Sequence, residues 1–375
     1  MKNMKNQIIK LIFAITIAFT AFSCTSDDNN KEIAKLPTIE ETLKADIANY
    51  SVLLNAIKVS AITNFASAGS YTLFAPTNAS FAAYTSTNFP AGITDAILVD
   101  ANGAPLASLT TAQKAELKTL VQNHILGVGT KANDLIASST ISGYVNTFAS
   151  GVTTVLTGNT LTTKMSMFIN KPTTNVLVNG GTTNGGATIT TADIDAGNGI
   201  IHKVDAVIRL PKLVNHIAAN PDLSSLLGVV TSTATGAYGD QSALLATLNG
   251  ASATAPLTVF APLNSAFATA TATGGFYNGA IVTTANTTKL VRYHLANTNL
   301  ASNSATSWTS SSATNDVTIT TLAATTQKFL ITKATLKITE LPAITVPASN
   351  MKIVNIQASN GNIHTIDRVL RPILP

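Results

Sequence analysis

GNGIIHKVDAVI at residues 197–208 decides the fold, because residues 359–370 repeat it as SNGNIHTIDRVL. Each copy opens with Asn-Gly, which is a strong turn signal. Apolar residues then alternate with polar ones, and this period predicts a half-buried β-strand in each copy. His202 and Asp205 are three positions apart, so they point to opposite faces of their strand and make a poor direct catalytic pair. His364 and Asp367 have the same spacing in the second copy.

Two further stretches recur ahead of this strand, in the same order in both halves. YTLFAPTNASF at residues 71–81 returns as LTVFAPLNSAF at residues 257–267. LVQNH at residues 120–124 returns as LVRYH at residues 290–294. A repeat made of three ordered markers predicts two domains with the same fold.

The repeat divides the chain into a first domain at residues 36–211 and a second at residues 212–375. The copies differ in length, because the first has extra residues around 89–110 between its markers and the second has a longer, Gly- and Ala-rich lead-in at 234–255 before its first marker. Such differences belong in surface loops. The two domains join through RLPK at 209–212 with little slack, so we expect a semi-rigid pair.

The first marker combines a strand end with a helix start. Proline cannot donate to a strand ladder, so Pro76 should end the β-prone run that contains Phe74. Asn78 is expected to cap the helix that follows, with Phe81 on the inner face of its first turn. These four residues are interpreted as structural, as are their counterparts Phe260, Pro262, Asn264 and Phe267.

The second marker ends an amphipathic helix expected at residues 112–125. Thr110 and Gln113 have the spacing of a capping box. His124 lies on the apolar side of this helix, and His294 repeats that placement in the second copy. For these residues a buried, hydrogen-bonded histidine is favoured over a metal ligand or a general base.

The three markers resemble those of the fasciclin domain. FAPTNxxF at 74–81 is similar to the first conserved block of that family, and NGxIHxxD at 198–205 and 360–367 to the second. The resemblance implies an α+β fold, with short N-terminal helices followed by strands packed as a sandwich or wedge. It also implies a role in cell adhesion or extracellular-matrix binding without catalytic activity.

Tyr293 and His294 resemble the central Tyr-His motif of the family, which in animal relatives is associated with integrin binding. The resemblance therefore implies these two residues as partner-binding candidates. In the first copy Asn123 stands in place of the tyrosine. The natural partner of this chain need not be an integrin.

The N-terminus predicts export and lipid anchoring. Residues 1–23 contain three lysines and then an apolar run too short for a membrane core that needs about 20 residues, which is typical of a cleaved signal peptide. Cys24 follows in a context that resembles the lipobox of bacterial lipoproteins, so we expect it to carry the lipid. Residues 24–35 are expected to form a tether, and the acidic run within them resembles the surface-export signal of Bacteroidetes lipoproteins. A plain solvated linker is the alternative.

These features place the protein at the outer membrane, lipid-anchored and exposed at the cell surface, although a periplasmic position stays open. Removing residues 1–23 lowers the formal net charge from +5 to +2, so no nucleic-acid partner is expected. The sequence has no Gly-x-Ser-x-Gly elbow, no phosphate-binding Gly-rich motif and no His-x-x-x-His or His-Glu-x-x-His pattern. We therefore expect no catalytic residue, metal or cofactor.

Two partner classes remain open at this stage, a surface or matrix protein and a polysaccharide. Carbohydrate sites commonly stack sugars on aromatic rings, yet only 6% of the residues are aromatic and Trp308 is the only tryptophan. Trp308 lies in the Ser- and Thr-rich stretch 304–315, where it is either a ligand platform or a packed anchor. A purely structural role as an envelope spacer is a third possibility.

Overall fold

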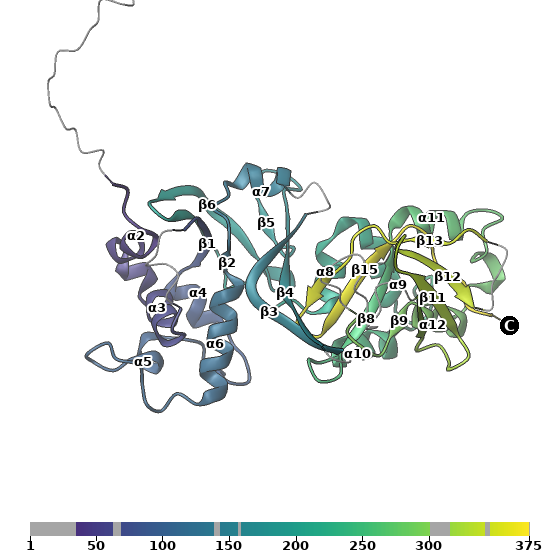
Figure 1. The fold of residues 1–375 in the computed structure, drawn as a ribbon, viewed down its shortest axis with the longest axis horizontal. Helices are drawn as coiled ribbons and strands as arrows, with labels where there is room; N and C mark the ends of the chain where they lie inside the picture. The colour runs from purple at the N-terminus through teal and green to yellow at the C-terminus, as the bar shows by residue number, and fades with distance from the viewer. Residues whose placement is uncertain are drawn as a thin grey trace, which may run out of the picture. The chain divides into compact units, whose positions relative to one another are not determined.

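A computed structural model describes residues 35–62, 69–138, 143–156, 159–300, 316–341 and 346–374. Figure 1 shows the first half of the chain in purple to teal and the second in green to yellow. Residues 37–375 belong to one compact unit. None of the helices among the described residues is long and apolar enough to cross a membrane.

The described residues of the first half form six helices. The helix expected at 112–125 is α6 (Thr111–Asn123), and its capping box is confirmed, because Thr110 Oγ1 accepts from the Gln113 amide at 3.1 Å while Gln113 Oε1 accepts from the Thr110 amide at 2.9 Å. The helix stops there because His124, at its C-terminal cap, has left the helical conformation. The other helices are α2 (Ile39–Ala45), α3 (Ile47–Val59), α4 (Asn78–Ala83), α5 (Asp95–Leu98) and α7 (Ala132–Ser138).

The strands of the first half close into one barrel in the order β1 to β7. β1 (Tyr71–Pro76) lies parallel to β7 (Gly199–Val204), so the first and last sequence markers are neighbours and Phe74 lies opposite His202. All other strand pairs in the barrel are antiparallel. They are formed by β2 (Ile125–Leu126), β3 (Tyr144–Leu156), β4 (Asn159–Asn170), β5 (Leu177–Val178) and β6 (Ala187–Ala196).

The second half repeats the parallel pair at its centre. β8 (Leu257–Pro262) lies parallel to β15 (Gly361–Ile366), and Phe260 lies opposite His364. The pair belongs to a sheet that also contains β9 (Leu295–Ala296) and β14 (Ile356–Ala358). A second sheet has the order β10 (Val317–Thr320), β11 (Lys328–Thr332), β12 (Lys337–Leu341) and β13 (Ser349–Asn350).

The helices of the second half are α8 (Leu213–Ala219), α9 (Ser224–Val230), α10 (Ser242–Gly250), α11 (Asn264–Thr271) and α12 (Thr284–Tyr293), with short 3-10 turns at Pro221–Leu223 and Gly279–Ile281. The expected α+β class is confirmed in both halves. Where the sequence predicted strands packed as a sandwich or wedge, the strands form a closed barrel in the first half and two four-stranded sheets in the second.

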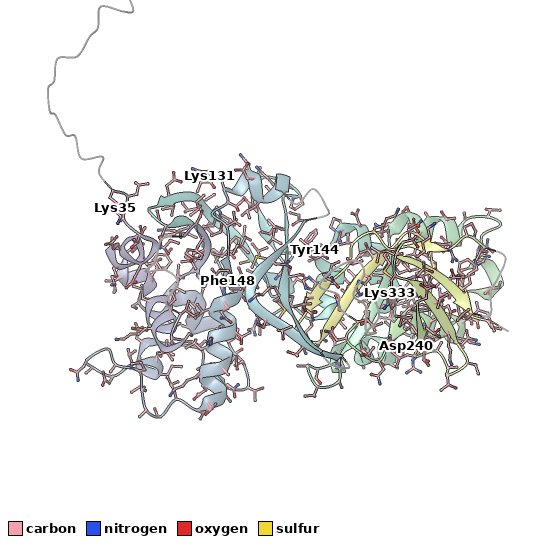
Figure 2. The ribbon with its side chains drawn as sticks, viewed as in Figure 1. Lys35, Lys131, Tyr144, Phe148, Asp240 and Lys333 are labelled. Carbon is pink, nitrogen blue, oxygen red and sulfur yellow. The ribbon has the colours of Figure 1, made fainter. Side chains whose placement is uncertain are left out.

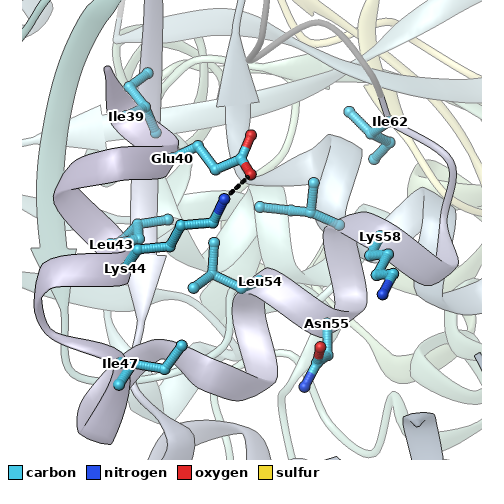
Figure 3. A pocket seen from close by; sticks show the side chains of 10 residues that line it. Ile39, Glu40, Leu43, Lys44, Ile47, Leu54, Asn55, Lys58 and Ile62 are labelled. Atoms are coloured by element: carbon cyan, nitrogen blue, oxygen red, sulfur yellow. Dashed lines mark ion pairs between the residues drawn. The ribbon is translucent and has the colours of Figure 1, made fainter. Parts of the chain in front are cut away.

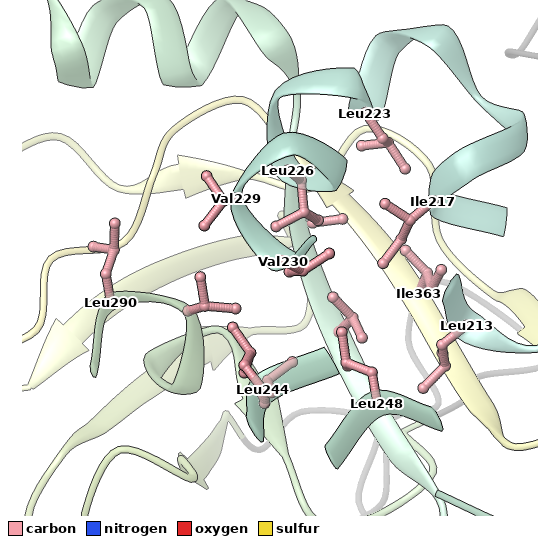
Figure 4. Close-up of a cluster of buried hydrophobic side chains, with 14 of the residues drawn as sticks. Leu213, Ile217, Leu223, Leu226, Val229, Val230, Leu244, Leu248, Leu290 and Ile363 are labelled. Atoms are coloured by element: carbon pink, nitrogen blue, oxygen red, sulfur yellow. The ribbon is translucent and has the colours of Figure 1, made fainter. Parts of the chain in front are cut away.

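The last strand of each half lies between two apolar cores, and for β15 this corrects the expectation of a half-buried strand. On β15, Ile363 belongs to the core beneath the helices and Ile366 to the core against the second sheet, and all six residues are buried. Figure 4 shows the first of these cores, where Leu226, Val230 and Leu248 gather near Ile363. The polar positions of β15 do not face water because both faces of the strand are covered, whereas Lys203 on β7 stays partly exposed.

The two halves touch directly beyond the linker at 209–212. Tyr144 of β3 (Figure 2) packs edge-on against the His216 ring of α8, with ring centroids 5.6 Å apart. The backbone amide of Gln357 donates to Ser166 Oγ at 2.9 Å. Asn184 Nδ2 donates to the Asn215 backbone carbonyl at 2.7 Å. The short linker is therefore supplemented by side-chain contacts.

Candidate functional site

The histidine that ends the second marker joins a helix to the segment after the last strand. His124 Nδ1 donates to the Leu120 carbonyl at 2.8 Å, and its Nε2 accepts from the Ile208 amide at 2.9 Å. His294 makes the same two bonds to Leu290 and Leu370, also at 2.8 and 2.9 Å. Because a backbone amide can only donate, each ring is held as the Nδ1–H tautomer.

The histidine of the last marker is held in the opposite tautomer. His202 Nε2 donates to the Thr130 carbonyl at 3.0 Å, and its Nδ1 accepts from the Asp193 amide at 3.1 Å. His364 donates in the same way to Leu300 at 2.7 Å and accepts from Asn355 at 3.1 Å. Each of these rings also lies against the phenylalanine of the neighbouring strand, Phe74 or Phe260.

Burial keeps these four rings neutral at neutral pH. Desolvation lowers the pKa of His124, His294 and His364 to about 4, and it also lowers the pKa of His202. A neutral imidazole with both nitrogens bonded to backbone has no free nitrogen for a substrate or metal. The structure therefore places these histidines where packing residues lie, away from any open cleft.

Asn78 and Asn264 do not cap their own helices, which corrects the expectation from sequence. Thr77 caps α4 by accepting from the Ser80 amide, and Leu263 at the start of α11 makes no side-chain cap. Asn264 instead reaches to the neighbouring segment, accepting from the Ser225 amide at 2.9 Å and donating to the Pro221 carbonyl at 2.8 Å. Asn78 bridges the Val52 amide and the Ala48 carbonyl in the same way.

In each half the bridged amide and carbonyl are four residues apart, the spacing at which an α-helix pairs them with each other. The asparagine amide therefore binds both ends of one helical turn. It also fixes the helix after the first strand to the helical segment that precedes it. The residues that form this contact lie far apart in the sequence, so no local capping rule could predict it.

Replacing this asparagine should destabilise the second half. In Asn264→Ala the Ser225 amide and the Pro221 carbonyl lose their partner, and we expect the free energy of unfolding to fall by about 2 kcal/mol. Chemical denaturation followed by circular dichroism measures the change. Ser265→Ala, at the exposed neighbouring position, should change it by less than about 0.5 kcal/mol. Equal stability of the two variants would contradict the bridging role.

Asp205 and Asp367 bind backbone beside the last strand. Asp205 Oδ1 accepts from the Thr188 amide at 2.7 Å, and Asp367 Oδ1 accepts from the Asn350 amide at 2.7 Å. Although burial opposes ionisation, bonds from Asn350 and Lys352 keep the pKa of Asp367 below its ordinary value. Each aspartate thus joins its last strand to a neighbouring strand, and neither is bonded to the histidine of its marker.

The Asn-Gly pairs do more than turn the chain, and this further role was not apparent from the sequence. Asn198 Oδ1 accepts from the Ile39 amide at 2.8 Å, and Asn360 Oδ1 accepts from the Leu213 amide at 2.8 Å. These amides start α2 and α8, the first described helix of each half. The repeat at 198 and 360 was the available signal, but the distant amide partner was not visible in it.

Tyr293 and His294, the two partner-binding candidates among the described residues, are buried. Tyr293 is 1% exposed and donates from its hydroxyl to the Lys328 carbonyl at 2.6 Å, and His294 is 2% exposed. Direct contact of these two side chains with a partner is therefore incompatible with the folded domain, because both are used in its interior. Trp308 and Cys24 lie outside the described residues.

An apolar groove lies between α2 and α3 in the first half (Figure 3). Its volume is about 540 Å³, and Ile47 at its edge is 55% exposed. Glu40 and Lys44 form an ion pair at 2.6 Å along the rim. The remaining lining residues are Ile39, Leu43, Leu54, Asn55, Ile57, Lys58 and Ile62.

A second repeated feature was also missed from sequence, an arginine after each last strand that lies over an aromatic ring. Arg209 lies 4.7 Å from the ring centroid of Tyr84, and Arg371 lies 4.5 Å from that of Phe276. The two arginines occupy equivalent positions of the repeat. Among the described residues, no group of three or more His, Cys, Asp and Glu side chains is placed to hold a metal ion.

Two consecutive α+β halves, each built on a parallel pair of marker strands with a histidine that joins a helix to the segment after the last strand, define a protein of two tandem domains with the same fold. The chain belongs to the fasciclin family, because the model described as "Fasciclin domain" matches residues 48–211 and 231–372. Fasciclin domains are generally associated with cell adhesion and not with catalysis.

Two comparisons accompany the family match. Protein sll1483 of Synechocystis sp. is 30% identical over 166 residues, which is 43% of this chain and 68% of that protein. The chain is also similar to a FAS1 domain pair from the insect cell adhesion molecule fasciclin I, at 13% identity and a TM-score of 0.44. That match covers 86% of this chain and 97% of the insect chain.

Proposed function

We propose that this protein is a lipid-anchored adhesin of the bacterial outer surface, which attaches cells to a matrix or surface partner without catalysis. The observation that carries the proposal is the burial of the residues shared by the two copies. The repeated histidines are at most 2% exposed and are bonded to backbone on both nitrogens. The repeat thus serves the fold, and recognition is left to exposed surfaces that differ between the halves.

The N-terminal features support anchoring at a membrane. Cys24 follows an apolar export signal, and the first described helix begins at Ile39. An extended chain spans at most about 3.6 Å per residue, so residues 24–36 reach roughly 40 Å. A tether of that length would keep the domains near the lipid surface and still let them meet a partner beyond it.

Attachment of cells tests this proposal. In a strain that lacks the protein, we expect adhesion to its native biofilm matrix to fall several-fold and to return with the wild-type gene. Cys24→Ala should release the protein from the membrane and fail to restore adhesion, while the purified chain added in solution should compete with wild-type cells. Exposure is measured by digesting intact cells with an external protease.

The matched control is Ser26→Ala in the tether, which leaves the anchoring cysteine in place and should restore adhesion fully. Undiminished adhesion of the deleted strain would contradict the proposal. Protection of the wild-type protein from external protease would contradict the outer-surface position.

A polysaccharide ligand is the second candidate. The pocket lined by Arg368 and Arg371 in the second half favours this ligand, and the first half lacks the counterpart of Arg368.

A further inference from the structure

A pocket of about 320 Å³ lies between α11, the loop after it and the segment that follows β15. We call it the Arg371 pocket. Two arginines line it, Arg368 and Arg371, together with the Phe276 ring and the exposed Thr269 and Thr273. Its remaining lining residues are Ala266, Ala270, Ala272, Gly274, Gly275 and Val369.

The two arginines of the pocket carry two positive charges, and Glu340 beside them supplies one negative charge. Glu340 is 3% exposed and pairs with Arg368, Nη2 to Oε2 at 2.6 Å. Its other oxygen accepts the backbone amide of Arg371 at 3.1 Å. Each carboxylate oxygen thus accepts one bond, and among the described residues the Arg371 guanidinium makes no hydrogen bond to this carboxylate.

The Phe276 ring positions the Arg371 guanidinium, which has N–H donors without a hydrogen-bond partner among the described residues. It lies 4.5 Å from the centroid of the Phe276 ring, which holds its plane. The Nε atoms of Arg368 and Arg371 are buried and have no hydrogen-bond partner. Burial and the neighbouring Arg368 charge lower the pKa of Arg371 from its ordinary value. These buried Nε atoms are out of reach of a ligand, so the donors available in the pocket are the Nη groups of Arg371, for which the described residues supply no acceptor.

The equivalent position in the first half differs from the Arg371 pocket. Arg209, the counterpart of Arg371, is exposed and donates from Nη1 to the Thr85 carbonyl at 2.8 Å. Ala206 stands where Arg368 stands in the second half. The first half therefore lacks the second arginine and satisfies the first one internally.

We propose that the Arg371 pocket binds the carboxylate of a uronic acid residue in an acidic polysaccharide. A guanidinium presents a planar fork that matches a carboxylate, and one uncompensated positive charge matches one carboxylate. The volume is at the lower end of ligand pockets, which span roughly 300–1,000 Å³, and so fits a single sugar ring. Threonine hydroxyls and the backbone of the glycine loop can meet sugar hydroxyls, while the alanines face the ring's C–H groups.

This inference rests on the proposed function for its biological setting, but it is tested on the purified protein. Isothermal titration of the full-length chain with trigalacturonate should show saturable binding, and a neutral galactose trisaccharide should bind at least about tenfold more weakly. Arg371→Gln should weaken trigalacturonate binding at least about tenfold, since a bond to a charged group is lost. Arg209→Gln, the matched variant in the first half, should bind as the wild type does.

A second variant protects the test against misfolding. Thr269 is exposed on α11, so Thr269→Glu leaves the core untouched and places a competing carboxylate at the pocket. We expect it to weaken trigalacturonate binding without lowering the melting temperature. Equal binding of the neutral trisaccharide, unchanged affinity in Arg371→Gln or Thr269→Glu, or an equal loss in Arg209→Gln would overturn the proposal.

Triglutamate and inorganic sulfate serve as competing probes, and binding of either one as tightly as trigalacturonate would overturn the sugar assignment. Failure of the pocket and failure of the adhesin proposal remain distinguishable. Adhesion that depends on Cys24 together with absent trigalacturonate binding refutes the pocket alone.

Discussion

Lowering the pH from 7 to 5 should remove several kcal/mol from the free energy of unfolding. Burial holds the pKa of His124, His216, His294 and His364 at about 4, whereas an unfolded histidine titrates near 6.5. Between these two values the unfolded chain binds more protons than the folded chain. Stability is therefore fully present above about pH 6.5 and is lost as the pH falls toward 4.

The size of this effect follows from the number of buried rings. Between pH 6.5 and 4 each buried histidine lowers the free energy of unfolding by about 1.4 kcal/mol per pH unit. By pH 5 the loss is therefore roughly 2 kcal/mol for each ring. Domains are stable by only about 5–15 kcal/mol, and the combined loss is comparable with that total. Protonation also turns Nε2 of His124 from an acceptor into a donor that faces the Ile208 amide.

Urea denaturation at pH 8, 7, 6 and 5, followed by circular dichroism, measures this dependence. The midpoint should be nearly the same at pH 8 and 7, which serves as the control interval, and should fall steeply below pH 6.5. A midpoint that stays constant down to pH 5 would show that the imidazoles are not held neutral in the folded protein.

Gly361→Ala should be among the most damaging single substitutions in the chain. Gly361 has a φ of +156°, and a Cβ there would lie 2.0 Å from the Leu257 carbonyl oxygen of the adjacent parallel strand. Gly199 is placed identically against Tyr71, with a distance of 2.1 Å. Because the obstructing atom is backbone, the strand pair has to separate, and we expect a loss of about 3 kcal/mol or more.

Gly228→Ala provides the matched control for this prediction. Gly228 lies within α9, and a Cβ there meets nothing within 4 Å. Alanine favours a helix over glycine, so this variant should gain roughly 0.5–1 kcal/mol. Thermal or urea denaturation compares both with the wild type, and a Gly361→Ala protein as stable as the Gly228→Ala protein would contradict the close approach.

Much of the fold was predictable because it follows from repeated local signals. The duplicated markers predicted two α+β domains, and Thr110 with Gln113 predicted the start of α6. The proline in FAP marked the end of β1 and of β8. These signals act over a few residues, so the sequence alone displays them.

The rest depends on contacts between distant residues. The parallel pairing of β1 with β7 joins residues more than a hundred positions apart, and no turn chemistry reports it. Packing of one core on each face buries β15 on both sides, which the alternating pattern alone could not indicate. Asn78 was assigned to the nearest helix because capping is a local rule, yet its amide bonds a helix about thirty positions earlier.

The candidate sites follow the same division. The packing role favoured for the histidines depended on apolar periodicity, which is local. The Arg371 pocket needs Phe276, Glu340 and Arg371 to meet from three segments, so its charge imbalance appears only in the folded chain. Tyr293 shows the limit of a resemblance, because a family-associated motif residue is buried here.

Imidazole nitrogen chemical shifts, recorded by NMR at pH 7, test most directly the claim that the repeated histidines are buried, neutral packing elements that join the segments of their own half. We predict neutral rings throughout, with the proton on Nδ1 in His124 and His294 and on Nε2 in His202 and His364. Charged rings, or rapid exchange between the two tautomers, would contradict this account.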